Sequence, residues 1–315
     1  MLGKNQIGKR VVVRRAAEII DGRRRYRDVI GELLNFSETT LWVRRDSGEI
    51  TPIPRTDVVA SKEIPPKPVS YKAIAGLERA AAETWPATET HWIGAWLLRA
   101  SGGWTNRANT ALPLGAPVEP LDDAIDEVSA WYTARGLTPG FAVPLPLSRR
   151  IAARLGERGW RSVDTVSVQT AAAEAIVGPP DGDPTIGLRL TNEPGPGWLR
   201  LATAAKGAEL PPHALDILGH GADRAFLSVG DVDAPTACAR GAISGSVAVV
   251  SLVIVSAEDR RGGIATAIMR ALAAWAIDRG ASTLCVQVVS ENQPAIALYQ
   301  KLGFVAHHSY VNMRP

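Results

Sequence analysis

The stretch VVSLVIVSAEDRRGGIATAIMRALAAWAIDRG, residues 249–280, contains the strongest local pattern in the chain. A nearly continuous apolar run is followed by a short charged turn and two glycines. Apolar residues then recur at helical spacing, at Ile264, Ile268, Leu272 and Trp275. This order predicts a buried strand, a tight loop and an amphipathic helix.

The predicted loop is suited to an anion. Gly262 and Gly263 lack Cβ atoms, so the backbone can curl closely and aim consecutive N–H groups outward, where the helix dipole adds positive potential. Arg260 and Arg261 add positive charge. The pattern favours a pyrophosphate site; the simpler alternative is a helix that begins with glycines beside solvated arginines. The sequence contains neither the GxxxxGK[ST] spacing of a Walker loop nor the dinucleotide-binding GxGxxG.

Two motifs in this part of the chain carry a family resemblance. RRGGIA at 260–265 matches the R/Q-x-x-G-x-G/A signature of the GNAT acetyltransferases, with Ala265 in the last small position. Downstream, an N-x-x-A-x-x-x-Y pattern in Asn292, Ala295 and Tyr299 precedes KLGF at 301–304. Residues 185–315 therefore resemble a GNAT superfamily N-acetyltransferase. The resemblance implies an α+β (α/β layered) fold with a mixed central sheet and flanking helices, which agrees with the mixed strands and helices expected along the chain.

The resemblance also implies an acetyl-CoA site. The amides of residues 261–266 would hold the pyrophosphate, the pantetheine arm would pair with the strand edge at 253–255, and Asn292 would supply a polar contact. Tyr299 would protonate the departing thiolate; the alternative is a packing tyrosine. No metal is expected. The predicted cofactor-binding residues are Val253, Ile254, Val255, Arg260, Arg261, Gly262, Gly263, Ile264, Ala265, Thr266 and Asn292.

The general base has no such assignment. The strand 247–255 contains no acidic residue, whereas many GNAT proteins place a glutamate there. Glu291, His213 and His220 are candidates by chemistry only, and the base stays open.

Residues 71–177 resemble a degenerate copy of the same fold. Both segments end in a helix, a glycine, an aromatic residue and a strand, at Gly159-Trp160 and Gly303-Phe304. The first segment has GAPVEPLDD at 115–123 in place of a phosphate loop, and its acidic residues would repel a pyrophosphate. One acetyl-CoA site is therefore expected, at 185–315. Six tryptophans lie in the degenerate segment, either in its core or along a substrate cleft.

The remaining elements follow from periodicity and turn residues. The first segment is expected to contain helices 71–85, 121–135 and 147–158 and strands 92–99, 107–114, 141–145 and 162–170. After a break at 178–185, the second is expected to contain strands 186–190, 225–229, 236–243, 247–255, 283–289 and 309–313 and helices 198–205, 214–218, 264–279 and 294–302.

The proline-bearing stretch SKEIPPKPVS, 61–70, predicts a linker. Before it, five short β-branched runs with turns predict a small basic β-barrel over 1–62, resembling Sm-like or Tudor-like modules. Residues 1–60 hold 12 Lys and Arg against 8 Asp and Glu, a net charge of +4, while the other 255 residues carry −1. RRRYR at 23–27 is either a nucleic-acid contact, with Tyr26 stacking, or a solvated turn.

The composition of the 315 residues, with 46% hydrophobic and 21% charged residues, is typical of soluble globular proteins and excludes disorder and fibres. The apolar run 247–255 is too short to cross a membrane, and MLGKNQIGKR at the start has no signal-peptide pattern. Cys238 and Cys285 form no disulfide framework. A cytoplasmic location without membrane partners is expected.

The favoured function is acetyl-CoA-dependent N-acetyl transfer to a primary amine by direct attack in a ternary complex. The acceptor is a small molecule or a protein. The alternative is a regulatory module that binds nucleic acid or protein through residues 1–60 and senses CoA with little catalysis. The oligomeric state stays open.

Overall fold

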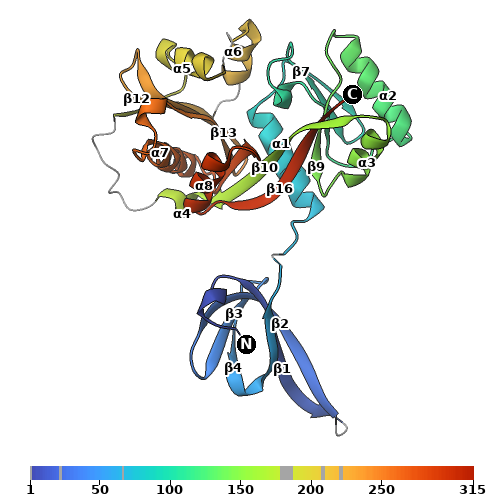
Figure 1. The fold of residues 1–315 in the computed structure, drawn as a ribbon, viewed down its shortest axis with the longest axis vertical. Coiled ribbons are helices and arrows are strands. Elements are labelled where there is room, and N and C mark those ends of the chain that lie inside the picture. The colour runs from blue at the N-terminus through green and yellow to red at the C-terminus, as the bar shows by residue number, and fades with distance from the viewer. Residues whose placement is uncertain (1, 21–22, 66, 178–186, 207–209, 220–222) are drawn as a thin grey trace. The chain divides into compact units, whose positions relative to one another are not determined.

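A computed structural model describes residues 2–20, 23–65, 67–177, 187–206, 210–219 and 223–315. The chain divides into two compact units, Met1–Pro68 and Val69–Pro315. The division falls inside the predicted linker 61–70. The first unit contains one sheet, the second contains an eight-stranded and a three-stranded sheet, and each unit has its own core (Figure 1).

The first unit is an antiparallel sheet in the order β4-β3-β2-β1-β5. Its elements are η1 (Lys4–Gln6), β1 (Arg10–Ile20), β2 (Arg23–Phe36), β3 (Thr40–Arg45), β4 (Ile50–Pro54), η2 (Arg55–Asp57) and β5 (Val58–Glu63). The five predicted strands are confirmed. Alternate apolar side chains such as Val11, Val13 and Val43 form one buried cluster. Within the described ladders β4 and β5 do not pair, so barrel closure and the Sm-like or Tudor-like resemblance stay predictions.

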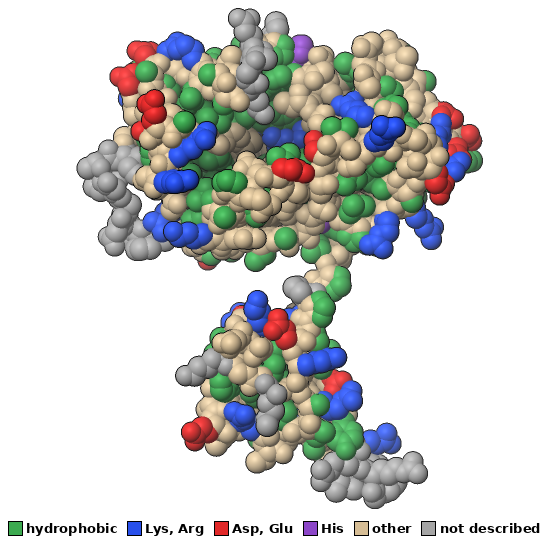
Figure 2. All heavy atoms as spheres, viewed as in Figure 1, with side chains coloured by type: hydrophobic (Ala, Val, Ile, Leu, Met, Phe, Trp, Pro, Cys, Tyr) green, Lys and Arg blue, Asp and Glu red, His purple; other side chains and the backbone are tan. Residues whose placement is uncertain are grey.

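The basic residues of the first unit are interspersed with acidic ones. Arg14 binds Asp28 through two hydrogen bonds of 2.8 and 2.9 Å, and Asp46 accepts from Arg10 at 3.2 Å. Figure 2 shows Lys and Arg side chains spread singly over this face of the unit, with acidic side chains between them. Among the described side chains, this distribution does not form the basic stripe that nucleic-acid binding uses; the side chains of Arg23 and Arg24 in RRRYR lie outside them.

Within Val69–Pro315, elements occur in two runs of similar order. The first run contains α1 (Tyr71–Thr84), β6 (Glu89–Ile93), β7 (Trp96–Ala100), η3 (Asn106–Ala108), β8 (Leu112–Pro113), α2 (Leu121–Thr133), β9 (Phe141–Leu145), α3 (Arg149–Glu157) and β10 (Arg161–Ala172), and α4 (Ala173–Val177) follows it. The second contains β11 (Leu188–Thr191), α5 (Pro196–Lys206), α6 (Pro212–Gly219), β12 (Arg224–Gly230), β13 (Pro235–Ser244), β14 (Val247–Val255), η4 (Ala257–Asp259), α7 (Ile264–Asp278), β15 (Thr283–Val289), α8 (Gln293–Lys301) and β16 (Val305–Arg314).

The last strands of the two runs are exchanged in the main sheet, whose order is β11-β12-β13-β14-β15-β10-β16-β9 (Figure 1). β10 pairs with β15 of the second run, and β16 pairs with β9 of the first. β10 and β16 pair with each other in the middle. The two runs therefore share one continuous sheet.

The helices before the exchanged strands end in the same way. Gly159 (φ 85°) and Gly303 (φ 91°) occupy the left-handed region after α3 and α8. In both places the N–H of the next aromatic residue, Trp160 or Phe304, donates to a carbonyl five residues back, and the aromatic ring is buried. This is the glycine-stopped helix end that the sequence predicted.

Two strand predictions in the first run were wrong. The stretch 92–99 is two antiparallel strands, β6 and β7, because Gly94 at φ 55° allows a tight turn between Ile93 and Trp96. In the stretch 107–114 only Leu112–Pro113 is a strand. The Asn109 side chain accepts hydrogen bonds from the N–H groups of Ser101 and Gly103, so this segment is held as a loop.

Helices α7 and α1 cover opposite faces of the sheet. α7 packs on one face with Ile268, Leu272 and Trp275. Leu77 and Ala81 of α1 pack with Val249, Cys285 and Tyr310 in a separate cluster. A helix of the first run therefore covers strands of the second.

A buried arginine ties α1 to the second run. The Arg240 guanidinium donates to the carbonyls of Leu218 at 3.0 Å and Thr84 at 2.9 Å, which end α6 and α1. Burial lowers the pKa of Arg240 to about 9. Among the described residues, no helix is long and apolar enough to cross a membrane.

The close approach of α7 to β13 depends on Gly241. A Cβ at this position would lie 2.9 Å from Trp275 Cζ3 and 3.2 Å from Leu272 Cδ2. We expect Gly241→Val to destabilise the protein by about 1–3 kcal/mol through overpacking. Thermal unfolding measures the effect, and Gly156→Val on α3, where a Cβ meets nothing within 4 Å, is the matched control. Equal melting temperatures for the two variants would contradict this packing.

Candidate functional site

The centre of the site is the point where β14 and β15 separate. Their parallel pairing runs from Val247 with Thr283 to Val250 with Val286 and then stops. β14 continues to Val255, paired only with β13, and β15 continues to Val289, paired only with β10. The edges that face each other beyond Val250 therefore have unpaired backbone groups.

A bulge in β14 lies directly at this separation. The register of β14 against β13 shifts between Ser251 and Ile254, and Leu252 has φ 54°, in the left-handed region. An extra residue of this kind bends a strand and increases its twist. The bend accounts for the loss of pairing with β15, and it leaves the edge at 253–255 open, where the sequence analysis placed the pantetheine arm.

The loop after β14 presents a run of free amides. Gly263 caps α7 with φ 82°, and Arg261 has φ 67°. In the described part of the chain, the N–H groups of residues 260–263 have no backbone acceptor, and the first bond at the helix start is Ala267 N–H to the Gly263 carbonyl at 3.0 Å. The first turn of α7 adds its own free N–H groups. The predicted loop residues thus form an exposed loop with free amides at a helix N-terminus, the geometry that anions bind in other proteins; an anion site here stays a prediction.

The two loop arginines differ. Arg260 Nε donates to the Val255 carbonyl at 3.1 Å, so its side chain folds back along the strand. Arg261 is exposed and forms no ion pair with the acidic residues that the structure describes. Arg261 is therefore the freer of the two to meet a phosphate.

Asn292 has a structural role in this geometry. Its Oδ1 accepts from Ala295 N–H at 3.2 Å and so caps α8. Because Oδ1 is used by this cap, the side-chain nitrogen would make the contact to the pantetheine arm that the resemblance implied. That contact stays a prediction.

Tyr299 lies on α8, 7% exposed, with its ring 5.5 Å from that of Phe304. Burial raises the pKa of Tyr299 to about 12. The hydroxyl is therefore protonated at neutral pH, and it has no hydrogen-bond partner among the described residues. The ring is packed, as the packing alternative required, and the O–H is free, as the proton-donor alternative required.

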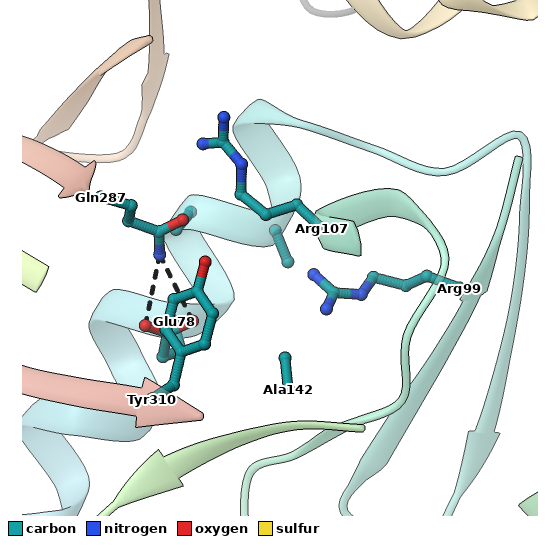
Figure 3. A pocket seen from close by; sticks show the side chains of 8 residues that line it. Glu78, Arg99, Arg107, Ala142, Gln287 and Tyr310 are labelled. Carbon is teal, nitrogen blue, oxygen red and sulfur yellow. Dashed lines mark hydrogen bonds between the residues drawn. The ribbon is translucent and has the colours of Figure 1, made fainter. Parts of the chain in front are cut away.

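A pocket opens on the α1 side of the sheet, near the separation of β14 and β15 (Figure 3). Gln287 and Tyr310 reach it from β15 and β16, Glu78 from α1, and Arg99 and Arg107 from the first run. Gln287 Nε2 donates to Glu78 Oε1 at 3.3 Å, and His308 Nε2 lies 2.9 Å from the same oxygen. The carboxylate of Glu78 is 4% exposed.

Two buried oxygens mark the same place. Ser251 Oγ and Gln287 Oε1 are buried without a hydrogen-bond partner. These residues are the first on β14 and β15 after the last pair, Val250 with Val286. Unpaired buried polar atoms are costly, so their coincidence at one point favours a bound polar group there.

The base candidates from sequence do not reach this pocket. Glu291 is exposed in the turn before α8, and His213 packs against Gly102. His220 lies outside the described residues. Sequence reasoning missed Glu78, although a signal existed: Glu78 interrupts the apolar stripe Ile74, Leu77, Ala81 and Ala82 of α1, where an unpaired charge is rarely buried.

Other features of the unit do not suit a phosphate or a metal. A second hollow, between α5, β13 and η4, contains Asp233, Glu258 and Asp259, whose charges oppose an anion. In the described ranges no group of three His, Cys, Asp or Glu is arranged to hold a metal ion.

The comparisons with known proteins agree with this geometry. A family model described as "Probable histone acetyltransferase Rv0428c C-terminal" matches residues 72–313. The "Probable histone acetyltransferase Rv0428c" of Mycobacterium tuberculosis is 32% identical over 290 residues, which cover 89% of this chain and 86% of the relative. The "Uncharacterized N-acetyltransferase YobR" of Bacillus subtilis is 28% identical over 241 residues, 74% of this chain and 96% of the relative.

Among solved structures, a GCN5-related N-acetyltransferase from Kribbella flavida aligns with a TM-score of 0.59 and 16% identity. The alignment covers 76% of this chain and 95% of that one. At this identity the likeness shows the GNAT fold. Together with the matched family model and relatives, it shows that the chain is an N-acetyltransferase of the GNAT type and belongs to the family described as probable histone acetyltransferase Rv0428c C-terminal.

Proposed function

We propose that the chain transfers the acetyl group of acetyl-CoA to a primary amine by direct attack within a ternary complex. The observation that carries the proposal is the separation of β14 and β15 beside the free amides of residues 260–266. An open strand edge and an anion cradle at one place fit the two recognition elements of CoA, its amide-bearing arm and its pyrophosphate. CoA supplies an acetyl group already activated as a thioester.

The loop residues would hold the cofactor. The amides of 261–266 would bind the pyrophosphate, with charge from Arg261 and, after release from Val255, Arg260. Val253, Ile254 and Val255 would pair with the arm, and Asn292 would contact it through its nitrogen. The neutral hydroxyl of Tyr299 would hold the proton that the leaving thiolate takes up.

Direct attack is favoured over a covalent acetyl-enzyme. Cys238 and Cys285 are buried, and burial raises the pKa of Cys238 to about 12 and that of Cys285 well above its usual range. A thiol that stays protonated at neutral pH is a poor nucleophile.

We further propose that residues 71–177 and 185–315 are two GNAT-like halves, of which only the second binds acetyl-CoA. The repeated element order, the exchanged last strands and the matching glycine-stopped helices support this proposal. In the first half, α2 corresponds to α7. The first turn of α2 carries Asp122 and Asp123, whose negative charges would repel an anion.

The acceptor belongs to the class of primary amines. The M. tuberculosis relative is named a probable histone acetyltransferase, and a lysine side chain falls within this class. The interspersed charges among the described side chains of the first unit do not favour the alternative of a nucleic-acid-binding sensor of CoA. Function in the cytoplasm remains the expectation.

Gly263 tests the anion cradle. Acetyl-CoA at about 100 times its Kd should stabilise the wild-type protein by about 2.7 kcal/mol. Gly263→Glu should abolish this stabilisation, because the side chain places a negative charge in the cradle. The matched control is Gly280→Glu, since Gly280 has nearly the same φ (81° against 82°) at the other end of α7. Both variants carry similar backbone strain. If acetyl-CoA still stabilised Gly263→Glu, the cofactor would have to bind at another place.

Tyr299→Phe tests the proton donor. We expect kcat to fall by about 100-fold or more, while the thermal shift with acetyl-CoA is kept. The comparison is steady-state release of CoA against the Tyr71→Phe variant, which loses an exposed hydroxyl at the start of α1. Turnover equal to that of Tyr71→Phe would restrict Tyr299 to packing.

The reactivity of the two thiols tests direct attack against a covalent acetyl-enzyme. Neither cysteine should react with a disulfide reagent in the native protein, because both are buried and protonated, and both should react after unfolding in guanidinium. Absorbance of the released thiolate gives the count. Fast reaction of one native thiol would revive a covalent acetyl-enzyme.

A further inference from the structure

The central strand of the second run lacks a carboxylate, but the structure supplies one from another element. Glu78, on α1, contacts Gln287, the first β15 residue after the pairing with β14 ends. Gln287 Oε1 and Ser251 Oγ are left unpaired at this point. A carboxylate thus lies beside Gln287, whose buried side-chain oxygen has no hydrogen-bond donor, and a primary amine is such a donor.

In the described part of the chain, the arginines of the pocket form no hydrogen bond or ion pair with this carboxylate. Arg99 donates its Nε and Nη2 to the carbonyl and hydroxyl of Thr110, at 3.0 and 3.1 Å. Arg107 lies over the ring of Trp85 at 4.5 Å. Among the described residues, Glu78 forms hydrogen bonds only with Gln287 and His308. No lysine or arginine side chain in the described part of the chain donates to it.

A chain of ring nitrogens leads away from Glu78. His308 is fully buried at its side chain, and its Nε2 contacts Glu78 Oε1 at 2.9 Å. Its Nδ1 lies 2.7 Å from Nδ1 of His307, which is only partly buried. A bulge brings the two rings together: β10 pairs Val168 with His308 and Gln169 with Ala306, so His307 is the extra residue.

We propose that Glu78 accepts the proton of the acceptor ammonium group and that His308 and His307 pass it to solvent. The inference rests on the proposed function. An N–H bond of the ammonium breaks and its proton goes to a Glu78 carboxylate oxygen, which leaves the nitrogen lone pair free to attack the thioester carbonyl. The Glu78 carboxyl then passes the proton to His308 Nε2. His308 Nδ1 donates its own proton to Nδ1 of His307, and His307 releases a proton to water. The net change at the amine is the loss of one proton.

The surroundings suit this direction of transfer. The groups that face Glu78 are Arg99 from β7, Arg107 from η3, Cys285 from β15, and His308 and Tyr310 from β16. Burial, followed by the neighbouring His308, lowers the pKa of His307, and Glu78 opposes this shift. His307 is thus neutral at neutral pH and gives up an accepted proton readily.

Glu78 would be the catalytic base, and the histidines would be positioning residues that act through it. In Glu78→Gln we expect kcat with a primary amine to fall about 100-fold or more near pH 7. The remaining rate should rise about tenfold per pH unit, as the free amine itself becomes available. The acetyl-CoA thermal shift should be kept. Glu83→Gln, an exposed glutamate of the same helix, is the matched control and should keep the wild-type profile.

His307→Ala provides a variant at the partly buried end of the chain. We expect a smaller loss of kcat, with KM for the amine unchanged, and recovery when imidazole is added to the buffer. A purely structural role for His307 would give no recovery. This variant also decides the question if Glu78→Gln fails to fold.

A measurement without acetyl-CoA tests the coupling itself. The ring protons of His307 can be titrated by NMR in the full chain. Because Glu78 raises the pKa of His307, Glu78→Gln should lower its titration midpoint further, whereas Glu83→Gln should not.

The outcomes separate the two proposals. If the wild-type protein releases no CoA with any primary amine, the proposed function fails and this inference fails with it, even if the histidine midpoint moves. If the wild type turns over but Glu78→Gln keeps the wild-type pH profile, or His307→Ala shows no imidazole recovery, the relay is refuted while the proposed function stands.

Discussion

The whole site depends on one constraint: the parallel pairing of β14 and β15 ends at Val250 and Val286. Parallel strands in a closed sheet satisfy each other's backbone groups and leave no room for a ligand. Here the bulge at Leu252 turns β14 away, while β15 is held on its other side by seven residue pairs with β10. The separation is therefore fixed from both sides, and its unpaired edges do not close by a small movement.

The separation also decides where chemistry can occur. α7 and α8 pack on one face of the sheet and bring the free amides and Tyr299. α1 packs on the other face and brings Glu78. The strands part between these two faces, and Ser251 and Gln287 carry unpaired oxygens at that point. A donor bound on the helix α7 side and an acceptor bound on the α1 side would meet there.

These features could be predicted from sequence only where the interacting residues lie close together in the chain. β14, the loop at 260–263 and α7 were predictable because a strand, a glycine turn and a helix are encoded by contiguous residues. The turn at Gly94 was missed, because a two-strand hairpin and one long strand share the same alternation when the turn residues are few. The role of Glu78 was not predictable from the second run at all, since its partners Gln287 and His308 lie more than two hundred residues away. The only local trace was a charge on an apolar helix face.

The exchange of the last strands explains why such a distant residue can serve the site. β16 pairs with β10 and β9 and not with β15, so His308 contacts Glu78 of the first run's helix α1. In the proposed relay, the other run thereby supplies the carboxylate that the central strand lacks, and the bulge in β16 that brings the two histidines together lies opposite β10. Neither run contains the full set of groups: the free amides and Tyr299 belong to the second, and Glu78 belongs to the first. On the proposed mechanism the first run does more than cover the sheet, because without α1 the amine would meet the thioester with no group to take its proton.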